Sequence, residues 1–139
     1  MVEGLINNMP FKSPLEPDGN FGHWFDLNKV GFKIEDFSKP VEIKLNQIKD
    51  WIEPTLPLDI EKSLKSEKDL FSLWKTFTPM ARWEWIRWIN STGNSETRTK
   101  RIKVAIDKMY KGERRPCCWN RNLCSEPLVS KNGILITAE

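Results

Sequence analysis

Apolar residues recur every three or four positions through the second half of the chain, which is the spacing of a helix that buries one face. Three stripes of this kind are visible: Leu70, Leu73, Trp74 and Phe77; Ala81, Trp85, Trp88 and Ile89; and Ile102, Ala105, Ile106 and Met109. Together with a short acidic segment before them, the stripes predict four helices, over residues 59–64, 70–77, 79–90 and 95–111.

Local end signals support these helices. Thr78 before Pro79 is typical of an N-cap followed by the first helical residue, because the Thr hydroxyl accepts a free backbone N–H and proline needs none. Asp59 and Ser95 are the expected N-caps of two further helices. Gly112 is the expected end of the last helix.

The pattern in the first 56 residues is weaker. Residues 1–20 hold three prolines and predict a loop or a loosely attached arm. Apolar and polar residues alternate over 30–34, which predicts a strand that pairs with 24–27 in a hairpin. A second alternation over 41–45 predicts another strand, and helical spacing then predicts a short helix over 45–52.

The pattern as a whole predicts a mainly α fold, with a compact helical C-terminal half of three to four helices and a small β or mixed N-terminal element. We divide the chain into residues 1–56 (arm and mixed element), 57–115 (helical domain) and 116–139 (an irregular tail that bears the cysteines). Residues 134–137 are the only expected strand of that tail. The length of 139 residues and the 39% hydrophobic content suit one globular unit.

Charge is distributed unevenly along the chain. Residues 96–139 carry ten cations and five anions, a net charge of +5, whereas residues 1–95 carry twelve cations and fourteen anions, a net charge of −2. A local positive field favours anionic partners such as nucleic acid, an acidic protein or phosphate. The alternative is a solvated basic helix, because the basic residues are not interleaved with stacking aromatics.

Three residues break the helical pattern. Arg82 and Arg98 fall within apolar stripes, and a cation in the first turn of a helix opposes the helix dipole. We therefore expect Arg98 to be more than half buried and paired, either by a carboxylate or carbonyls from another element or by an anionic ligand that Arg82 shares. Trp83 lies opposite its stripe, either under the N-terminal segment or as an exposed contact residue. The remaining candidates for contact with a partner or an anion are Arg101, Arg114 and Arg115.

The cysteines lie close together, at positions 117, 118 and 124. Adjacent Cys117 and Cys118 suit zinc poorly, since zinc motifs usually separate two ligands by two to four residues, so we expect no metal. Neighbouring arginines favour the thiolate form, which leaves Cys117, Cys118 and Cys124 as thiol candidates beside the interpretation that they are incidental reduced thiols. We find no catalytic constellation and expect no cofactor.

Residues 57–115 resemble the YdeI/OmpD-associated family, which is described as a family of bacteriocin-protection proteins. The resemblance is carried by an Arg-x-x-aromatic-x-x-Trp-Ile helix over 82–89 and a Glu-Thr-Arg-x-x-Arg-Ile run over 96–102, after two helices over 58–64 and 70–77. Residues 111–121 look like a cysteine-bearing extension of some members. The chain departs from the family at Thr92-Gly93, where Ala-Lys is common, and at Trp83, where a basic residue is common.

The resemblance implies a mostly helical, non-enzymatic protein linked to envelope stress or bacteriocin tolerance, and it supplies no catalytic residues. We predict a small cytoplasmic interaction protein with an unknown protein partner, no cofactor and no insertion into a membrane. One alternative is a nucleic-acid-binding module that uses the basic 96–121 region. Another is a thiol-reactive redox protein that uses Cys117 and Cys118.

Overall fold

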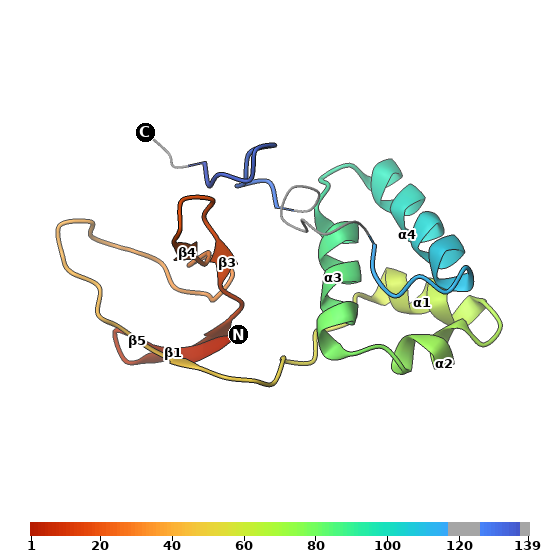
Figure 1. Ribbon diagram of the computed structural model, residues 1–139, viewed down its shortest axis with the longest axis horizontal. Coiled ribbons are helices and arrows are strands. Elements are labelled where there is room, and N and C mark those ends of the chain that lie inside the picture. The colour runs from red at the N-terminus through yellow and green to blue at the C-terminus, as the bar shows by residue number, and fades with distance from the viewer. Residues whose placement is uncertain (117–125, 137–139) are drawn as a thin grey trace.

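The computed structural model describes residues 1–116 and 126–136, and its elements separate into two halves (Figure 1). The β half, residues 1–47, contains every named strand of the described chain, and the helical half, residues 58–116, contains every named helix. A linker, residues 48–57, joins them. Residues 126–136 return to the β half, where the N–H of Leu135 donates to the carbonyl of Asp18 at 2.9 Å.

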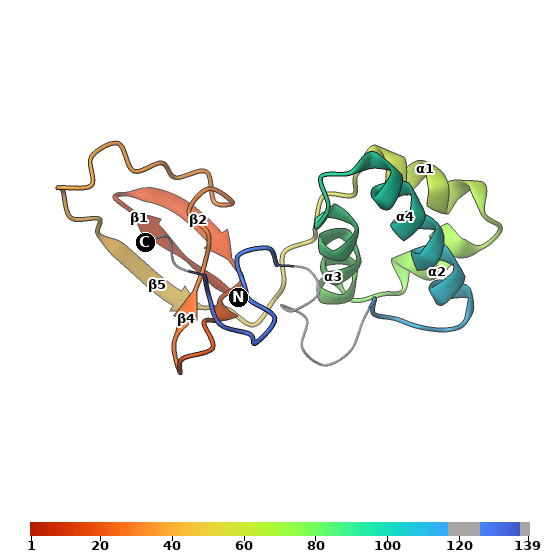
Figure 2. The same ribbon diagram turned by 90° about the horizontal axis from the view of Figure 1, so that it is seen from above.

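The main sheet of the β half has three antiparallel strands in the order β2-β1-β5 (Figure 2). They are β1 (Val2–Ile6), β2 (Met9–Ser13) and β5 (Ile43–Gln47). A second, two-stranded ladder pairs β3 (Glu16–Pro17) with β4 (His23–Trp24). Residues 1–20 are thus largely sheet, and their interpretation as a loop or loose arm is wrong.

A tight hairpin explains why residues 1–20 form strands despite their prolines. Asn7 and Asn8 both have positive φ, 45° and 69°, and asparagine tolerates this conformation in the two-residue turns that suit a twisted hairpin. Pro10 lies opposite Leu5 on β2, an edge strand, where a missing N–H need not break a ladder. Gly4 allows β5 to approach, because a Cβ added there would lie 1.7 Å from the Lys44 carbonyl oxygen.

The core of the β half consists of Val2, Ile6 and Phe11, with Phe25 stacked on Phe11 at 5.1 Å. The predicted strand over 30–34 and its hairpin are wrong. Residues 27–31 form a turn, and apolar side chains that follow it pack against the core instead of pairing in a sheet. The second predicted strand, over 41–45, is confirmed for residues 43–45 within β5, but the helix over 45–52 is wrong because residues 43–47 pair with β1.

Four helices form the helical half, as the periodicity predicts: α1 (Leu58–Ser66), α2 (Leu70–Lys75), α3 (Pro79–Asn90) and α4 (Ser95–Tyr110). The hydroxyl of Thr78 caps α3 by accepting from the Ala81 N–H, as expected. Asn94 caps α4 in place of Ser95, and α1 follows Pro57 without a side-chain cap, so Asp59 does not serve as one.

The fold class is mixed, which corrects the prediction of a mainly α protein. Helices account for 34% and strands for 17% of the described structure. The prediction failed because the prolines of residues 1–20 are typical of loops and hid a hairpin there, and because the pairing of β1 with β5 is too distant in sequence to leave a local pattern. The expected strand over 134–137 is a single bridge between Val129 and Leu135, and Thr137 lies outside the described residues. No helix in the described chain has the length and apolar character needed to span a membrane.

Candidate functional site

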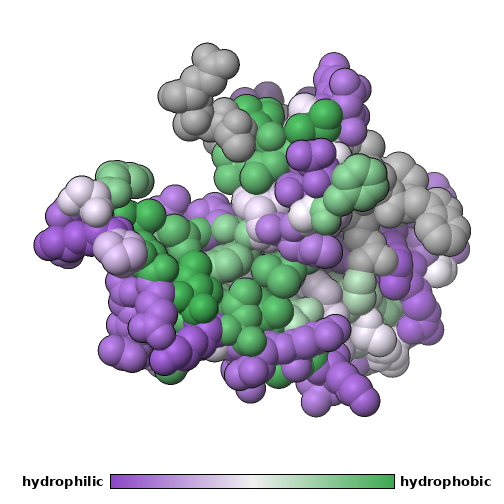
Figure 3. All heavy atoms as spheres, turned by 60° about the vertical axis from the view of Figure 1, so that its left-hand side comes forward, coloured by the Kyte–Doolittle hydropathy of each residue, from purple (hydrophilic) through white to green (hydrophobic). Residues whose placement is uncertain are grey.

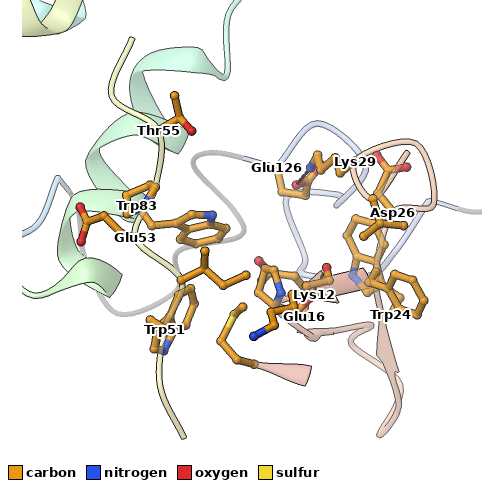
Figure 4. Close-up of a pocket in the computed structure, with 17 residues that line it drawn as sticks. Lys12, Glu16, Trp24, Asp26, Lys29, Trp51, Glu53, Thr55, Trp83 and Glu126 are labelled. Atoms are coloured by element: carbon orange, nitrogen blue, oxygen red, sulfur yellow. Dashed lines mark hydrogen bonds and ion pairs between the residues drawn. The ribbon is translucent and has the colours of Figure 1, made fainter. Parts of the chain in front are cut away.

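A cavity of about 320 Å³ lies where the β half meets α3 and the linker. We call it the tryptophan cleft, because its walls include Trp24 from β4, Trp51 from the linker and Trp83 from α3. Figure 4 shows Trp51 and Trp83 on one side of the cleft and Trp24, with Lys29 and Glu126, on the other. The cleft exists only because the two halves are held against each other.

Helix periodicity explains why Trp83 faces the cleft. The stripe that contains Trp85 and Ile89 is buried in the helical core, and Trp83 lies about 160° around the helix from Trp85. Its ring packs against Trp51 at 5.2 Å with a tilt of 54°. Arg87, one turn later, places its guanidinium 4.9 Å from the centre of the Trp83 ring. Trp83 therefore packs against the linker that follows the β half, and its role as a contact residue stays a prediction.

Charged side chains from four separate segments join the halves beside the cleft. Arg87 of α3 contacts the carboxylate of Glu16 at 2.5 Å, and both side chains are largely buried. Arg87 also lies 3.7 Å from Glu126, which in turn accepts from Lys29 at 2.7 Å. The Glu126 side chain is only 3% exposed, so these partners are needed to offset the cost of burying its charge.

One polar group of the cleft walls has no acceptor. The indole N–H of Trp24 is buried and makes no hydrogen bond within the described structure. A buried donor without a partner costs free energy, and a bound group with a carbonyl or carboxylate oxygen would relieve that cost. The side chain of Trp24 lines the cleft, so it is the clearest polar feature that points to a ligand there.

The structure pairs both arginines that interrupt the apolar stripes. The Arg98 side chain is 25% exposed and binds the Asp59 carboxylate through Nε at 2.6 Å and Nη2 at 3.0 Å. The expectation of a more than half-buried residue paired from another helix is confirmed. The hydrogen bond from Arg98 also holds the pKa of Asp59 below its usual range. Arg82 binds Glu53 and donates to the carbonyl of Phe77 at the end of the preceding helix.

The other predicted contact residues are spread over a different surface. Arg101 donates to the Trp88 carbonyl at 2.6 Å and stacks over the Trp88 ring at 5.3 Å. Arg114 lies 5.5 Å from the Phe77 ring, and Arg115 lies 3.7 Å from the buried carboxylate of Glu84. Of the candidates that fall within the described residues, only Trp83 lines the cleft wall. Contact of the arginines with a partner stays a prediction.

The thiol candidates Cys117, Cys118 and Cys124 lie outside the described residues. Within the described ranges, no group of three or more His, Cys, Asp or Glu side chains is placed to hold a metal ion. The expected absence of zinc at the cysteines therefore stays a prediction.

Several residues of the cleft were missed in the sequence. They are Trp24, Trp51, Glu16 and Glu126 in its lining, and Arg87, which contacts two of these residues beside the cleft. Each comes from a different part of the chain, and no motif or spacing connects them. The available signal was compositional: seven tryptophans are more than the helical stripes use, so some were free to line a surface.

Comparison with known proteins supports the predicted resemblance. Residues 53–112 match the model of the family described as "Bacteriocin-protection, YdeI or OmpD-Associated". The match covers the last part of the linker and all four helices, and it leaves the sheet of the β half outside. Neither the search of curated proteins nor that of solved structures found a match to this chain.

Proposed function

We propose that this chain, which carries a YdeI/OmpD-associated region, is a non-enzymatic binding protein that acts in bacteriocin protection by holding a segment of a partner protein in the tryptophan cleft. The family match supports the biological role. The observation that carries the binding role is the meeting of Trp24, Trp51 and Trp83 around one cavity, with a buried indole N–H that finds no acceptor among the described residues.

The chemistry of the cleft suits a protein segment. Apolar and aromatic walls with a few polar groups are typical of ligand sites, and tryptophans concentrate where proteins bind one another. Trp51 and Trp83 offer an apolar surface for a side chain of the partner. The Trp24 indole offers a hydrogen bond to a backbone carbonyl of the same segment.

The charge of the cleft argues against nucleic acid at this site. Its lining holds four carboxylate side chains and two lysines: Glu16, Asp26, Glu53 and Glu126 against Lys12 and Lys29. Three of these carboxylates pair with Arg82 or Arg87, so the cleft presents no excess of cations that would attract a phosphate backbone. The main alternative, binding through the basic 96–121 region, is weakened because Arg98 and Arg101 are occupied by groups of the chain itself.

The proposal is tested by survival under bacteriocin challenge. Bacteria that are sensitive to a bacteriocin would express the parent chain, Trp83→Ala or the matched control Phe37→Ala. Phe37 is an aromatic residue with 87% exposure that does not line the cleft. We expect the parent and the Phe37 variant to raise survival equally, and the Trp83 variant to give little protection at the same expression level.

Two outcomes would contradict the proposal. Absence of protection by the parent chain would remove the biological role. Full protection by a Trp83→Ala variant that circular dichroism shows to be folded would support a role in bacteriocin protection but would show that the tryptophan cleft is not needed for it.

A further inference from the structure

Strand β5 presents an edge that no other described strand pairs with. It is the last strand of the β2-β1-β5 sheet, and all five of its residues are exposed. The carbonyl of Glu42 accepts from the Asn7 N–H at 2.9 Å, and the N–H of Ile48 donates to the Met1 carbonyl at 3.1 Å. Even-numbered residues therefore point their backbone groups toward β1. The backbone groups of the odd-numbered residues, Ile43 and Leu45 among them, point outward from the sheet.

Apolar side chains lie along the same edge. Ile43 is 43% exposed and Leu45 is 44% exposed, and they lie opposite Ile6 and Gly4 of β1. Figure 3 shows apolar side chains gathered on the surface of the β half that faces the viewer. An exposed edge strand with apolar residues is a template for another strand, and proteins that remain monomeric usually block such edges.

The sequence of this edge is complementary to itself. Residues 41–45 read Val-Glu-Ile-Lys-Leu, so an antiparallel copy centred on Ile43 places Glu42 opposite Lys44 on both sides of the two-fold axis. The same register places Ile43 opposite Ile43 and Val41 opposite Leu45. A register centred on Lys44 would instead oppose two lysines, which is unfavourable.

The backbone geometry agrees with the register centred on Ile43. Because Ile43 points its N–H and carbonyl outward, it can exchange both hydrogen bonds with its copy. Glu42 and Lys44 then form the non-hydrogen-bonded pairs, in which side chains approach most closely. Both side chains are exposed, 67% for Glu42 and 64% for Lys44, and within one chain they pair with each other at 2.9 Å, so dimerisation exchanges this ion pair in each copy for two between the copies.

We propose that β5 pairs with β5 of a second copy of this chain, which joins two three-stranded sheets into one six-stranded sheet across a two-fold axis at Ile43. The pairing satisfies the outward backbone groups, covers Ile43 and Leu45, and closes the interface, because each edge is used once. It uses no residue of the tryptophan cleft and does not depend on the proposed function.

Charge exchange tests this pairing by sedimentation equilibrium from micromolar to millimolar concentration. Glu42→Lys places lysines opposite lysines, and Lys44→Glu places glutamates opposite glutamates. We expect each variant alone to dimerise about tenfold more weakly than the parent, or worse. An equimolar mixture of the two restores opposite charges at every pair, so we expect it to dimerise as the parent does. Lys103→Glu, an exposed change on α4, should leave the parent equilibrium unaltered.

A backbone variant tests the edge itself. Leu45→Pro removes an outward N–H, whereas the even-numbered residues that pair with β1 keep theirs. We expect Leu45→Pro to be monomeric, with the far-ultraviolet circular dichroism of the parent. A parent chain that stays monomeric throughout would overturn the proposal. So would a dimer that both single charge variants form as strongly as the parent, because another surface would then hold it.

Discussion

The helical half and the β half are stabilised by cores of very different size. Twelve buried residues form one continuous core between α1, α2, α3 and α4. Three buried residues, surrounded by partly buried apolar side chains from turns, form the core of the β half. The β half therefore depends more on strand pairing and on contacts with segments outside its sheet, such as the ion pairs between Arg87 and Glu16 and between Lys29 and Glu126.

This difference assigns separate roles to the two halves. The larger core makes the helical half the rigid support, and Trp83 is placed by a helix whose opposite face is buried in that core. The β half adds Trp24 and part of the cleft wall from turns and short strands. The candidate site therefore takes residues both from the half with the large core and from the half with the small core, which we expect to unfold more readily.

The largest expected effect is the loss of Trp85 from the helical core. Trp85 is fully buried, and its indole N–H donates to the Arg114 carbonyl at 3.0 Å. Trp85→Ala should lower the free energy of unfolding by about 3–5 kcal/mol, measured by urea denaturation with circular dichroism. Trp88→Ala should cost less, because Trp88 is only partly buried beneath Arg101. A loss below about 1 kcal/mol for Trp85→Ala would show that this core is not the main support.

The second prediction asks whether the halves unfold separately. Ile6 is fully buried in the β half, and Ile6→Ala should lower the free energy of unfolding of that half by about 2–4 kcal/mol. If the small core is independent, urea should unfold the β half of this variant first and leave the helical signal intact until a higher concentration. Native-state hydrogen exchange would resolve the two sets of amides. A single transition that shifts as a whole would mean that the halves form one cooperative unit.

The third prediction concerns the pair that connects α4 to α1. From spacing alone, the loss of Arg98 is expected to cost about 2–4 kcal/mol, as for a buried charge pair. The structure reduces this to about 1–2 kcal/mol for Arg98→Ala, since the Asp59 side chain is 48% exposed. Arg98→Lys should retain only part of this stabilisation, because an ammonium group cannot bind both carboxylate oxygens in the same way. The exposed Lys100→Ala should cost under about 0.5 kcal/mol.

A smaller effect is expected from pH at the same pair. The pKa of Asp59 in the folded protein is lowered from 3.8, chiefly by its hydrogen bond with Arg98. Above pH 3.8 the pair stabilises the fold, and this contribution is lost as pH falls through the lower folded pKa. Parent and Asp59→Asn should therefore differ by under about 1 kcal/mol at neutral pH and converge in acid. A difference that grows as the pH falls would contradict the assignment.

The two halves also differ in what their sequence reveals. The helical half was predictable because its signals are local: Thr78 and Pro79 mark the start of α3, and apolar residues at helical spacing mark its buried face. The β half was not, because β1 pairs with a strand that begins at Ile43, and the turn at Asn7-Asn8 is a weaker hairpin signal than Asn-Gly. The prolines and asparagines of residues 1–20 therefore favoured the prediction of a loop over that of the strands that form there.

The candidate site shows the same limit. The position of Arg98 in an apolar stripe predicts that a partner exists, yet nothing in the sequence identifies that partner as Asp59. Trp83 was identified by its place opposite the buried stripe. Trp24 and Trp51 were not, because they lie outside regular helices and reach the cleft through the packing of the two halves.

Affinity for a selected peptide tests the central claim, that function resides where the two halves meet. Peptides would be selected from a random display library on the parent chain, and calorimetry would compare their binding to the parent, Trp83→Ala and Phe37→Ala. The account predicts that Trp83→Ala weakens binding by about thirtyfold, as for a central tryptophan in an interface, and that Phe37→Ala leaves it unchanged. Selection of peptides that bind Trp83→Ala as tightly as the parent would contradict the account.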